Sequence, residues 1–389
     1  MLKIPKVIFL VETSRAYGRG LLRGFAQYSK LNGPWLFFIG PEFYVKGIEH
    51  SYRWMKDLDA DGIIAPLWDD AIIKMIDSLG LPAVICGIER PSLRACRVVT
   101  DDVAVGRMAA EYFLERGFRR FAFCGFNDAI WSQRRSESFS KSFKDVGYET
   151  HIYKRHKSAK KRSSEAEQTF IAEWLKSLPK PVAIMACNDD RGQDVLAACR
   201  LAMLEVPGEV AILGVDDDEL VCDMSYPQLS SIAVNTERAG YEAARVLDKL
   251  MSGQQIEEDE KVVHISPLHV VTRQSTDIMA IEDQLVADAV HFIRMHSRKV
   301  IQVGDVAEAV GLSRRALEQH FKKVLRHSVH DEIKYARVSQ MADLLINTNL
   351  TMSQIARFLG YPNASNIARY FKKKKGISPL EYRKNFGPK

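Results

Sequence analysis

The stretch SQIARFLGYPNASNIARYFKKKKG, residues 353–376, decides the fold of the C-terminal part of the chain. Apolar side chains recur in it at steps of four residues, at Ile355 and Leu359 before a Gly-Tyr-Pro-Asn sequence and at Ile367 and Phe371 after it. This spacing is typical of one buried helix face, and the break rich in Gly, Pro and Asn predicts a turn. We therefore expect helix, turn, helix, with the four lysines at the end of the second helix.

A second copy of this pattern lies upstream, in GDVAEAVGLSRRALEQHFKKVL at residues 304–325. Gly311 matches Gly360 at an offset of 49 residues, and Phe321 matches Phe371 at an offset of 50. One extra residue in the second turn accounts for the difference. Two copies of one structural unit rarely arise by chance, so the sequence predicts a duplicated helix-turn-helix.

The net charge of +6 is unevenly distributed along the 389 residues. Residues 280–389 contain 19 Lys and Arg against 10 Asp and Glu, whereas residues 1–279 contain 36 against 39. A basic C-terminal third on a slightly acidic remainder indicates a polyanionic partner for that third alone.

Near the start, the most apolar run is VIFLV at residues 7–11, which has the length of a strand and falls short of a signal peptide or a membrane span. We therefore expect a cytoplasmic protein. The six cysteines show no C-x-x-C spacing and no partner histidines, so we expect buried reduced thiols, no metal site and no cofactor.

Short apolar, β-branched runs alternate with helical patterns over the larger part of the chain, which is typical of parallel sheets covered on both faces. Roughly ten such strands exceed one comfortable doubly wound sheet, so we expect two lobes. The predicted organisation is an α/β domain at 1–278, with lobe 1 at about 1–102 plus 236–275 and lobe 2 at about 103–235, followed by an all-α domain at 279–389.

The first strand leads into SRAYGRGLLRG at residues 14–24, which invites a dinucleotide-binding interpretation. Its glycines are spaced G-x-G-x-x-x-G, one residue longer than the usual fingerprint, and no convincing ribose-binding acid follows the second strand. We therefore favour a strand-to-helix turn at a sheet edge where ligands of open α/β sheets bind.

Polar side chains collect after other strands and fit a neutral polyhydroxy ligand. Asn188 and Asp189 follow one strand, and Asp216 follows the next. Trp131 and Arg135 are four residues apart, hence on one face of a helix. Carboxylates accept hydrogen bonds from sugar hydroxyls, arginine donates to sugar oxygens, and an aromatic ring covers an apolar sugar face. For each acid by itself, a helix N-cap is the competing interpretation.

Most of the segment at residues 5–275 resembles the LacI-type and periplasmic sugar-binding family. The resemblance rests on RSESF at 135–139, on the Asn-Asp pair at 188–189 and on Gly-Val-Asp at 214–216. It implies that the arginine, the asparagine or aspartate, and the aspartate of these motifs contact an effector. From the other lobe, we expect Tyr17 and Asp69 to close over the ligand.

The C-terminal third resembles the AraC-type regulators over about 100 residues. Gly360, Ser365, Arg369 and Tyr382 stand where that signature places them, whereas Asn366 replaces a common aromatic or histidine. Each second helix is expected in a DNA major groove, with the 327–347 helix between them setting the spacing. The expected DNA contacts are Arg314, Arg315, Glu318, Gln319, Lys322, Lys323, Ala364, Asn366, Arg369, Tyr370, Lys372 and Lys373.

A sugar sensor ahead of an AraC-type DNA reader resembles the xylose-responsive regulators of enteric bacteria. The resemblance implies D-xylose as effector, activation of xylose catabolism genes, RNA polymerase as partner and a homodimer. Another aldose, such as arabinose, ribose or a hexose, stays open as the effector. A sugar-processing enzyme is the remote alternative, because we find no nucleophile motif and no metal-ligand spacing. A transport receptor conflicts with the paired helix-turn-helix units.

Overall fold

The computed structural model describes residues 3–39, 54–66, 70–87, 95–154, 164–257, 259–278, 283–297, 300–325, 327–361, 364–375 and 377–386. The chain divides into two compact units. The N-terminal unit is Met1–Phe113 with Arg120–Asp277, and the C-terminal unit is Ile278–Lys389 with Leu114–Arg119.

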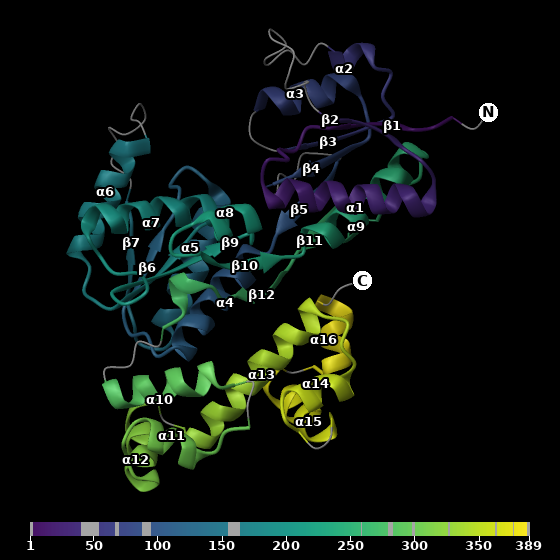
Figure 1. Cartoon of the computed structure of the whole chain (residues 1–389). Helices are drawn as coiled ribbons and strands as arrows, with labels where there is room; N and C mark the ends of the chain where they lie inside the picture. Colours follow the sequence, from purple (N-terminus) through teal and green to yellow (C-terminus); the bar gives the residue numbers. More distant parts are fainter. Residues whose placement is uncertain are drawn as a thin grey trace. The chain divides into compact units, whose positions relative to one another are not determined.

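The N-terminal unit contains two six-stranded sheets, one in each lobe (Figure 1). Lobe 1 has the strand order β11-β5-β4-β3-β1-β2. Its strands are β1 (Lys6–Phe9), β2 (Leu36–Ile39), β3 (Gly62–Pro66), β4 (Ala83–Cys86), β5 (Cys96–Thr100) and β11 (Val262–Ile265). Its helices are α1 (Ala16–Asn32), α2 (Trp54–Asp57), α3 (Asp70–Leu79) and α9 (Thr236–Met251), and η2 (Asp259–Lys261) precedes β11.

Lobe 2 has the strand order β12-β10-β9-β8-β6-β7. Its strands are β6 (Phe121–Cys124), β7 (Thr150–Ile152), β8 (Val182–Ala186), β9 (Val210–Val215), β10 (Ser230–Val234) and β12 (Pro267–Val271). Its helices are α4 (Asp102–Glu115), α5 (Ile130–Lys144), α6 (Ser164–Ser177), α7 (Asp189–Ala202) and α8 (Glu219–Met224), and η3 (Gln274–Thr276) follows β12.

The sheets are parallel where the sequence predicts continuous apolar runs. Every residue of β3, β4, β8, β9 and β10 is buried, as expected for strands that helices cover on both faces. The predicted two-lobed α/β fold is confirmed. The last strand, β12, departs from the pattern because it pairs antiparallel with β10 and is only partly buried.

The pairing of β12 also corrects the expected lobe boundaries. Residues 236–275 were expected in lobe 1 as a whole, yet β12 lies in the sheet of lobe 2. A single residue, Ser266, separates β11 in one sheet from β12 in the other. The chain therefore crosses between the lobes a third time.

The glycines of the SRAYGRGLLRG stretch serve helix packing. Gly20 and Gly24 lie on α1, where it runs alongside α9 (Figure 1). A Cβ at Gly20 would lie 2.0 Å from Thr236 Oγ1, and one at Gly24 would lie 2.1 Å from the carbonyl oxygen of Glu237. Gly24 therefore lets the backbones of the two helices touch, and Gly20 makes room for the Thr236 side chain, so the four-residue spacing of these two glycines follows from helix packing.

The C-terminal unit consists of helices in its described residues (Figure 1). They are α10 (Gln284–Met295), α11 (Val303–Ala309), α12 (Arg314–Val324), α13 (Val329–Asn347), α14 (Met352–Phe358), α15 (Ala364–Lys375) and α16 (Pro379–Phe386). The predicted duplication is confirmed, because α11 and α12 form one helix-turn-helix and α14 and α15 form the other. Each has its own apolar core, around Phe321 in the first and Phe371 in the second.

The two copies also begin alike. Gln302 N donates to Asp305 Oδ2 at 2.7 Å before α11, and Thr351 N donates to Gln354 Oε1 at 2.7 Å before α14. Each bond has the geometry of a capping box, in which the third helical side chain returns to the N-cap backbone. The offset of 49 residues between the boxes repeats the offset of the sequence pattern.

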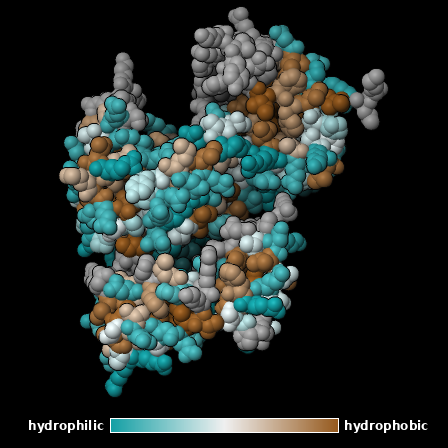
Figure 2. All heavy atoms as spheres, in the orientation of Figure 1, coloured by the Kyte–Doolittle hydropathy of each residue, from teal (hydrophilic) through white to brown (hydrophobic). Residues whose placement is uncertain are grey.

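Hydrophilic residues cover most of the visible face of the molecule, and hydrophobic ones form scattered groups (Figure 2). Within the described residues, we find no helix with the length and apolar character needed to cross a membrane. All six cysteines are buried free thiols, as expected, and burial raises the pKa of the Cys96 thiol to about 12. The described His, Cys, Asp and Glu side chains form no group suited to hold a metal ion.

Candidate functional site

Arg135 occupies the centre of a polar cluster at the carboxyl ends of the strands. It lies on α5 and its side chain is only 4% exposed. Its Nε donates to Asp102 Oδ1 at 2.8 Å, and its Nη1 donates to the carbonyl oxygen of Cys187 at 2.6 Å. Its Nη2 lies 4.0 Å from Asp216 Oδ1. The guanidinium plane is thereby fixed between two carboxylates.

Trp131 covers one side of this arginine. The Arg135 guanidinium carbon lies 5.0 Å from the centroid of the Trp131 ring, so the prediction that the two share a helix face is confirmed. Trp131 stays partly exposed, whereas Arg135 is buried. An aromatic surface thus lies beside a buried donor, which is the combination that a sugar ring uses.

Asp216 follows β9 with a backbone φ of 102°, a conformation that side chains other than glycine rarely adopt. Burial raises the pKa of its carboxyl to about 6, while Arg135 lowers this pKa and Asp102 raises it further. Its side chain keeps 21% of its surface exposed. A strained backbone and a perturbed pKa at a strand end are typical of a ligand site.

Tyr17 brings lobe 1 into the same cluster. It lies in the first turn of α1, and the side chain of Thr100 at the end of β5 is close enough to affect the pKa of its hydroxyl. Burial raises the pKa of Tyr17, and the nearby Asp216 carboxylate adds to that effect. The expected partner Asp69 lies outside the described residues.

Asn188 and Asp189 have contacts that belong to the fold. Asn188 Oδ1 accepts from Arg191 N at 3.0 Å, which makes it the N-cap of α7. The buried Asp189 carboxylate accepts from Ser231 Oγ at 2.6 Å and from Asp218 N at 2.8 Å. Burial raises its pKa well above the ordinary range. The competing N-cap interpretation therefore accounts for Asn188, and a ligand role for either residue stays a prediction.

Asp102 orients Arg135 and was not predicted as a site residue, although it too follows a strand. The ion pairs between the lobes were not predicted either. Arg15 Nε lies 2.9 Å from Asp190 Oδ1, and Arg19 Nη2 lies 2.9 Å from Asp218 Oδ1.

Asp218 also accepts the amide N–H of Ala16 at 2.6 Å, at the start of α1. The residues of both ion pairs flank the motifs already singled out, since two arginines surround Tyr17 and the two acids follow Asp189 and Asp216. Their position beside those motifs is the feature of the sequence that could have indicated these ion pairs.

The first candidate DNA-reading helix is α12. Ser313 is its N-cap and accepts from Ala316 N at 3.2 Å, as the sequence predicts. Leu317 and Phe321 are fully buried, which turns the opposite face outward. The exposed residues of that face are Arg314, Arg315, Gln319, Lys322 and Lys323.

Glu318 differs from its predicted neighbours on α12. It is only partly exposed, and its Oε2 accepts from Val329 N at 3.4 Å, at the start of α13. A carboxylate at a helix N-terminus is stabilised by the helix dipole. Its described contact is therefore structural, and base contact by Glu318 stays a prediction.

The second candidate DNA-reading helix is α15. Ile367 and Phe371 are fully buried, Arg369 is exposed and Tyr370 is partly exposed. Lys372 and Lys373 are exposed in its last turn. Ala364 and Asn366 lie within the helix, but their side chains are outside the described set.

The two helix-turn-helix units are connected by α13 and touch one another near Gly360. The 19 residues of α13 span about 28 Å at 1.5 Å per residue. Gly360 has a φ of 73°, and a Cβ there would lie 2.2 Å from Val300 Cγ2. The turn of the second helix-turn-helix therefore packs against the residues that lead into α11. This contact helps to fix the two helix-turn-helix units relative to each other.

Comparison with known families agrees with this division. A model described as a periplasmic binding protein-like domain matches residues 110–276. A model described as a helix-turn-helix domain matches residues 306–385.

Curated relatives extend over nearly the whole chain. The xylose operon regulatory protein of Haemophilus influenzae is 30% identical over 388 residues, which cover 98% of this chain and 98% of that protein. The chain belongs to the family of xylose operon regulatory proteins. The Escherichia coli K12 member of this family is 29% identical over 389 residues, which cover 98% of this chain and 97% of that protein.

Solved structures of known proteins also match this chain. A structure titled xylose-binding transcription activator XylR has a TM-score of 0.63 and 28% identity, with full coverage of both chains. A cellobiose complex of the regulator CelR has a TM-score of 0.55 and 23% identity over 71% of this chain and 86% of that one, and it supports the fold alone. The chain is thus a sugar-responsive, DNA-binding transcription regulator.

Proposed function

We propose that this family member is a D-xylose-dependent activator of xylose catabolism genes. Residues 1–278 would bind the sugar and form a homodimer, and residues 279–389 would bind promoter DNA beside RNA polymerase in the cytoplasm. The names of the full-length relatives support xylose as the effector. Arabinose, ribose or a hexose remain the competing effectors.

The fixed guanidinium of Arg135 between Asp102 and Asp216 is the observation that carries the sugar site. Sugar hydroxyls both donate and accept, so they need carboxylate acceptors and an arginine donor within one small volume. Asp216 supplies the acceptor, Arg135 the donor and Trp131 the aromatic face. Charge-assisted hydrogen bonds contribute about 1.5 to 3 kcal/mol each, so three or four suffice for micromolar binding.

The contacts between the lobes supply a mechanism. Arg135 and Asp216 belong to lobe 2, whereas Tyr17 belongs to lobe 1, so a sugar held by all three bridges the lobes. The Arg19–Asp218 ion pair joins the same two lobes. Sugar binding would favour the closed form over an open one and so shift the population of dimer geometries that present the DNA-reading helices.

The free energy needed to shift the population toward the active state can be estimated. Raising an active state from 1% to 99% takes about 5.5 kcal/mol of differential affinity. The sugar need not supply all of it, because duplex DNA also prefers the active geometry. Two or three hydrogen bonds between sugar and protein that form only in the closed state would supply the part of this free energy that DNA binding does not.

The exposed faces of α12 and α15 suit base recognition. Arginine pairs with guanine O6 and N7, and asparagine or glutamine pairs with adenine N6 and N7. Arg315 and Gln319 on α12, and Asn366 and Arg369 on α15, are the proposed base contacts. The exposed lysines at the helix ends would contact phosphates and add affinity that is sequence-blind and salt-dependent.

A thermal-shift screen of the full-length protein against pentoses and hexoses tests the sugar assignment. A ligand at 100 times its dissociation constant stabilises the folded state by about 2.7 kcal/mol. We expect D-xylose to give the largest rise in melting temperature, and Asp216→Ala to abolish that rise. Glu219→Gln, an exposed substitution in the first turn of α8, is the matched control and should retain it. A rise with a hexose alone would overturn the xylose assignment.

A further inference from the structure

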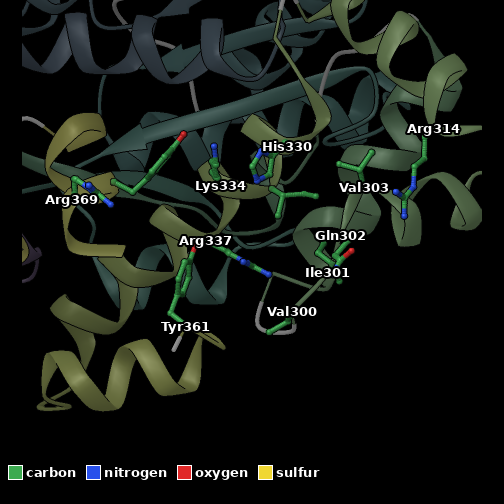
Figure 3. A pocket seen from close by; sticks show the side chains of 12 residues that line it. Val300, Ile301, Gln302, Val303, Arg314, His330, Lys334, Arg337, Tyr361 and Arg369 are labelled. Carbon is green, nitrogen blue, oxygen red and sulfur yellow. The ribbon is translucent and has the colours of Figure 1, made fainter. Parts of the chain in front are cut away.

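A strongly basic pocket of about 660 Å³ lies within the C-terminal unit (Figure 3). Five of its lining side chains are basic, namely Arg314, His330, Lys334, Arg337 and Arg369. Its lining, which is made of described residues, includes no aspartate or glutamate. A concave surface with cations and no carboxylate in its wall attracts anions.

The pocket lies between the two proposed DNA-reading helices. Arg314 comes from α12 and Arg369 from α15, and Figure 3 shows side chains of α13 between them. His330, Lys334 and Arg337 follow one another at helical spacings of four and three residues, so they lie on one face of α13. That face spans roughly 10 Å along the helix axis.

Aromatic rings hold two of these cations in place. Lys334 Nζ lies 4.8 Å from the centroid of the Tyr370 ring, and the Arg337 guanidinium carbon lies 5.3 Å from that of Tyr361. Both rings also line the pocket. Lys334 has one longer ion pair, at 3.8 Å, with Asp331 one turn earlier. These cation–π contacts position both side chains at the wall of the pocket.

We infer that the pocket receives the phosphate backbone of the DNA segment that passes between the two major-groove contacts. The inference rests on the proposed function and extends it, because α13 then becomes a third DNA contact in addition to a spacer. Lys334 and Arg337, one turn apart on α13, match successive phosphates of one strand, and His330 extends this row of nitrogen donors by one more turn. A single small anion would instead be bound by donors that converge on one point.

Such contacts fix register and orientation without reading bases. The pocket would therefore set how the duplex lies between α12 and α15 and contribute to the salt dependence of binding. It would leave the preferred sequence unchanged.

The salt dependence of DNA binding tests this inference. A duplex is first selected from a random pool by the wild-type, full-length protein. Its dissociation constant is then measured by fluorescence anisotropy over a range of salt concentrations. Each lost phosphate contact lowers the slope of log affinity against log salt by about 0.9. We expect Lys334→Gln with Arg337→Gln to lower the slope by about 1.8, with the base preference unchanged.

Lys384→Gln is the matched control, because Lys384 is exposed on α16 and does not line the pocket. Its slope should equal that of the wild type. If the double variant melts earlier than the wild type, the single variant Lys334→Gln replaces it, with an expected loss of about 0.9.

An unchanged slope in a folded pocket variant would overturn the inference while leaving the proposed function standing. Inorganic phosphate that raises the melting temperature of the DNA-free wild type but not of the pocket variant, together with an unchanged slope, would identify a small-anion site instead. If the wild type selects no duplex at all, the proposed function itself fails and the inference fails with it.

Discussion

Replacing Asp216 by asparagine should stabilise the sugar-free protein and weaken its sugar complex. Burial raises the pKa of this carboxyl from 3.8 to about 6. A carboxyl whose pKa rises on folding destabilises the fold in its charged form, and this penalty is absent below pH 3.8 and complete above pH 6. The difference corresponds to about 3 kcal/mol at pH 8 and about half of that at pH 5. Asparagine removes the charge and tolerates the positive φ of this position.

The same substitution should cost affinity for the sugar. The neutral amide lacks the charge that strengthens hydrogen bonds from sugar hydroxyls, a loss of about 1.5 to 3 kcal/mol. That loss corresponds to a dissociation constant roughly 10 to 150 times higher. Stability and affinity therefore change in opposite directions, which a nonspecific disturbance of the fold would not produce.

Thermal unfolding at pH 5 and pH 8, with calorimetric titration of D-xylose at pH 8, measures both effects. Glu219→Gln should change neither quantity, since this side chain is exposed on α8. The reasoning is refuted if Asp216→Asn melts no higher than the wild type at pH 8, or if its gain is as large at pH 5. Unchanged xylose affinity would remove Asp216 from the sugar site.

Four further substitutions test other parts of the structure. Gly360→Ala should lower the melting temperature of the C-terminal unit, because the positive φ and the contact with Val300 leave no room for a Cβ. The free energy of unfolding should fall by more than about 1 kcal/mol, and an unchanged melting temperature would contradict this. Lys373→Ala should reduce the slope of log DNA affinity against log salt by about 0.9, and Arg369→Ala should relax the base preference. A relaxed base preference in Lys373→Ala, or a reduced salt slope with unchanged base preference in Arg369→Ala, would exclude the proposed roles. Asp218→Asn, which weakens the ion pair between the lobes, should increase the radius of gyration of the sugar-free protein in X-ray scattering; identical curves would show that the pair does not hold the lobes.

The fold can be predicted from the sequence wherever burial alone determines the residue type. A strand covered on both faces is mostly apolar, so GIIAP marks β3 to the residue. SSIAV marks β10 in the same way, although it begins with Ser230 and Ser231, whose buried hydroxyls are hydrogen-bonded within the fold. The sheet to which β12 belongs cannot be predicted in this way. Only its pairing with β10, across more than thirty residues of sequence, puts it in lobe 2, and its own residues suit either sheet.

The candidate site is predictable where its members are close in sequence. Trp131 and Arg135 share one turn of α5, so their contact follows from helical spacing. Asp102 reaches Arg135 from 33 residues away, and Arg19 reaches Asp218 from 199 away. Such pairs depend on how β5, α1 and β9 are arranged in space. Likewise, the φ of 102° that separates Asp216 from a simple helix cap leaves no mark in the sequence.

Control of DNA affinity by the sugar is the central claim, and an anisotropy titration tests it most directly. The full-length protein is titrated onto its selected duplex with and without saturating D-xylose. Coupling between two sites is typically 1 to 3 kcal/mol, so xylose should raise DNA affinity roughly 5 to 150 times. Asp216→Ala should bind DNA as the sugar-free wild type does and show no response to xylose. Equal DNA affinity of the wild type with and without xylose would contradict the account.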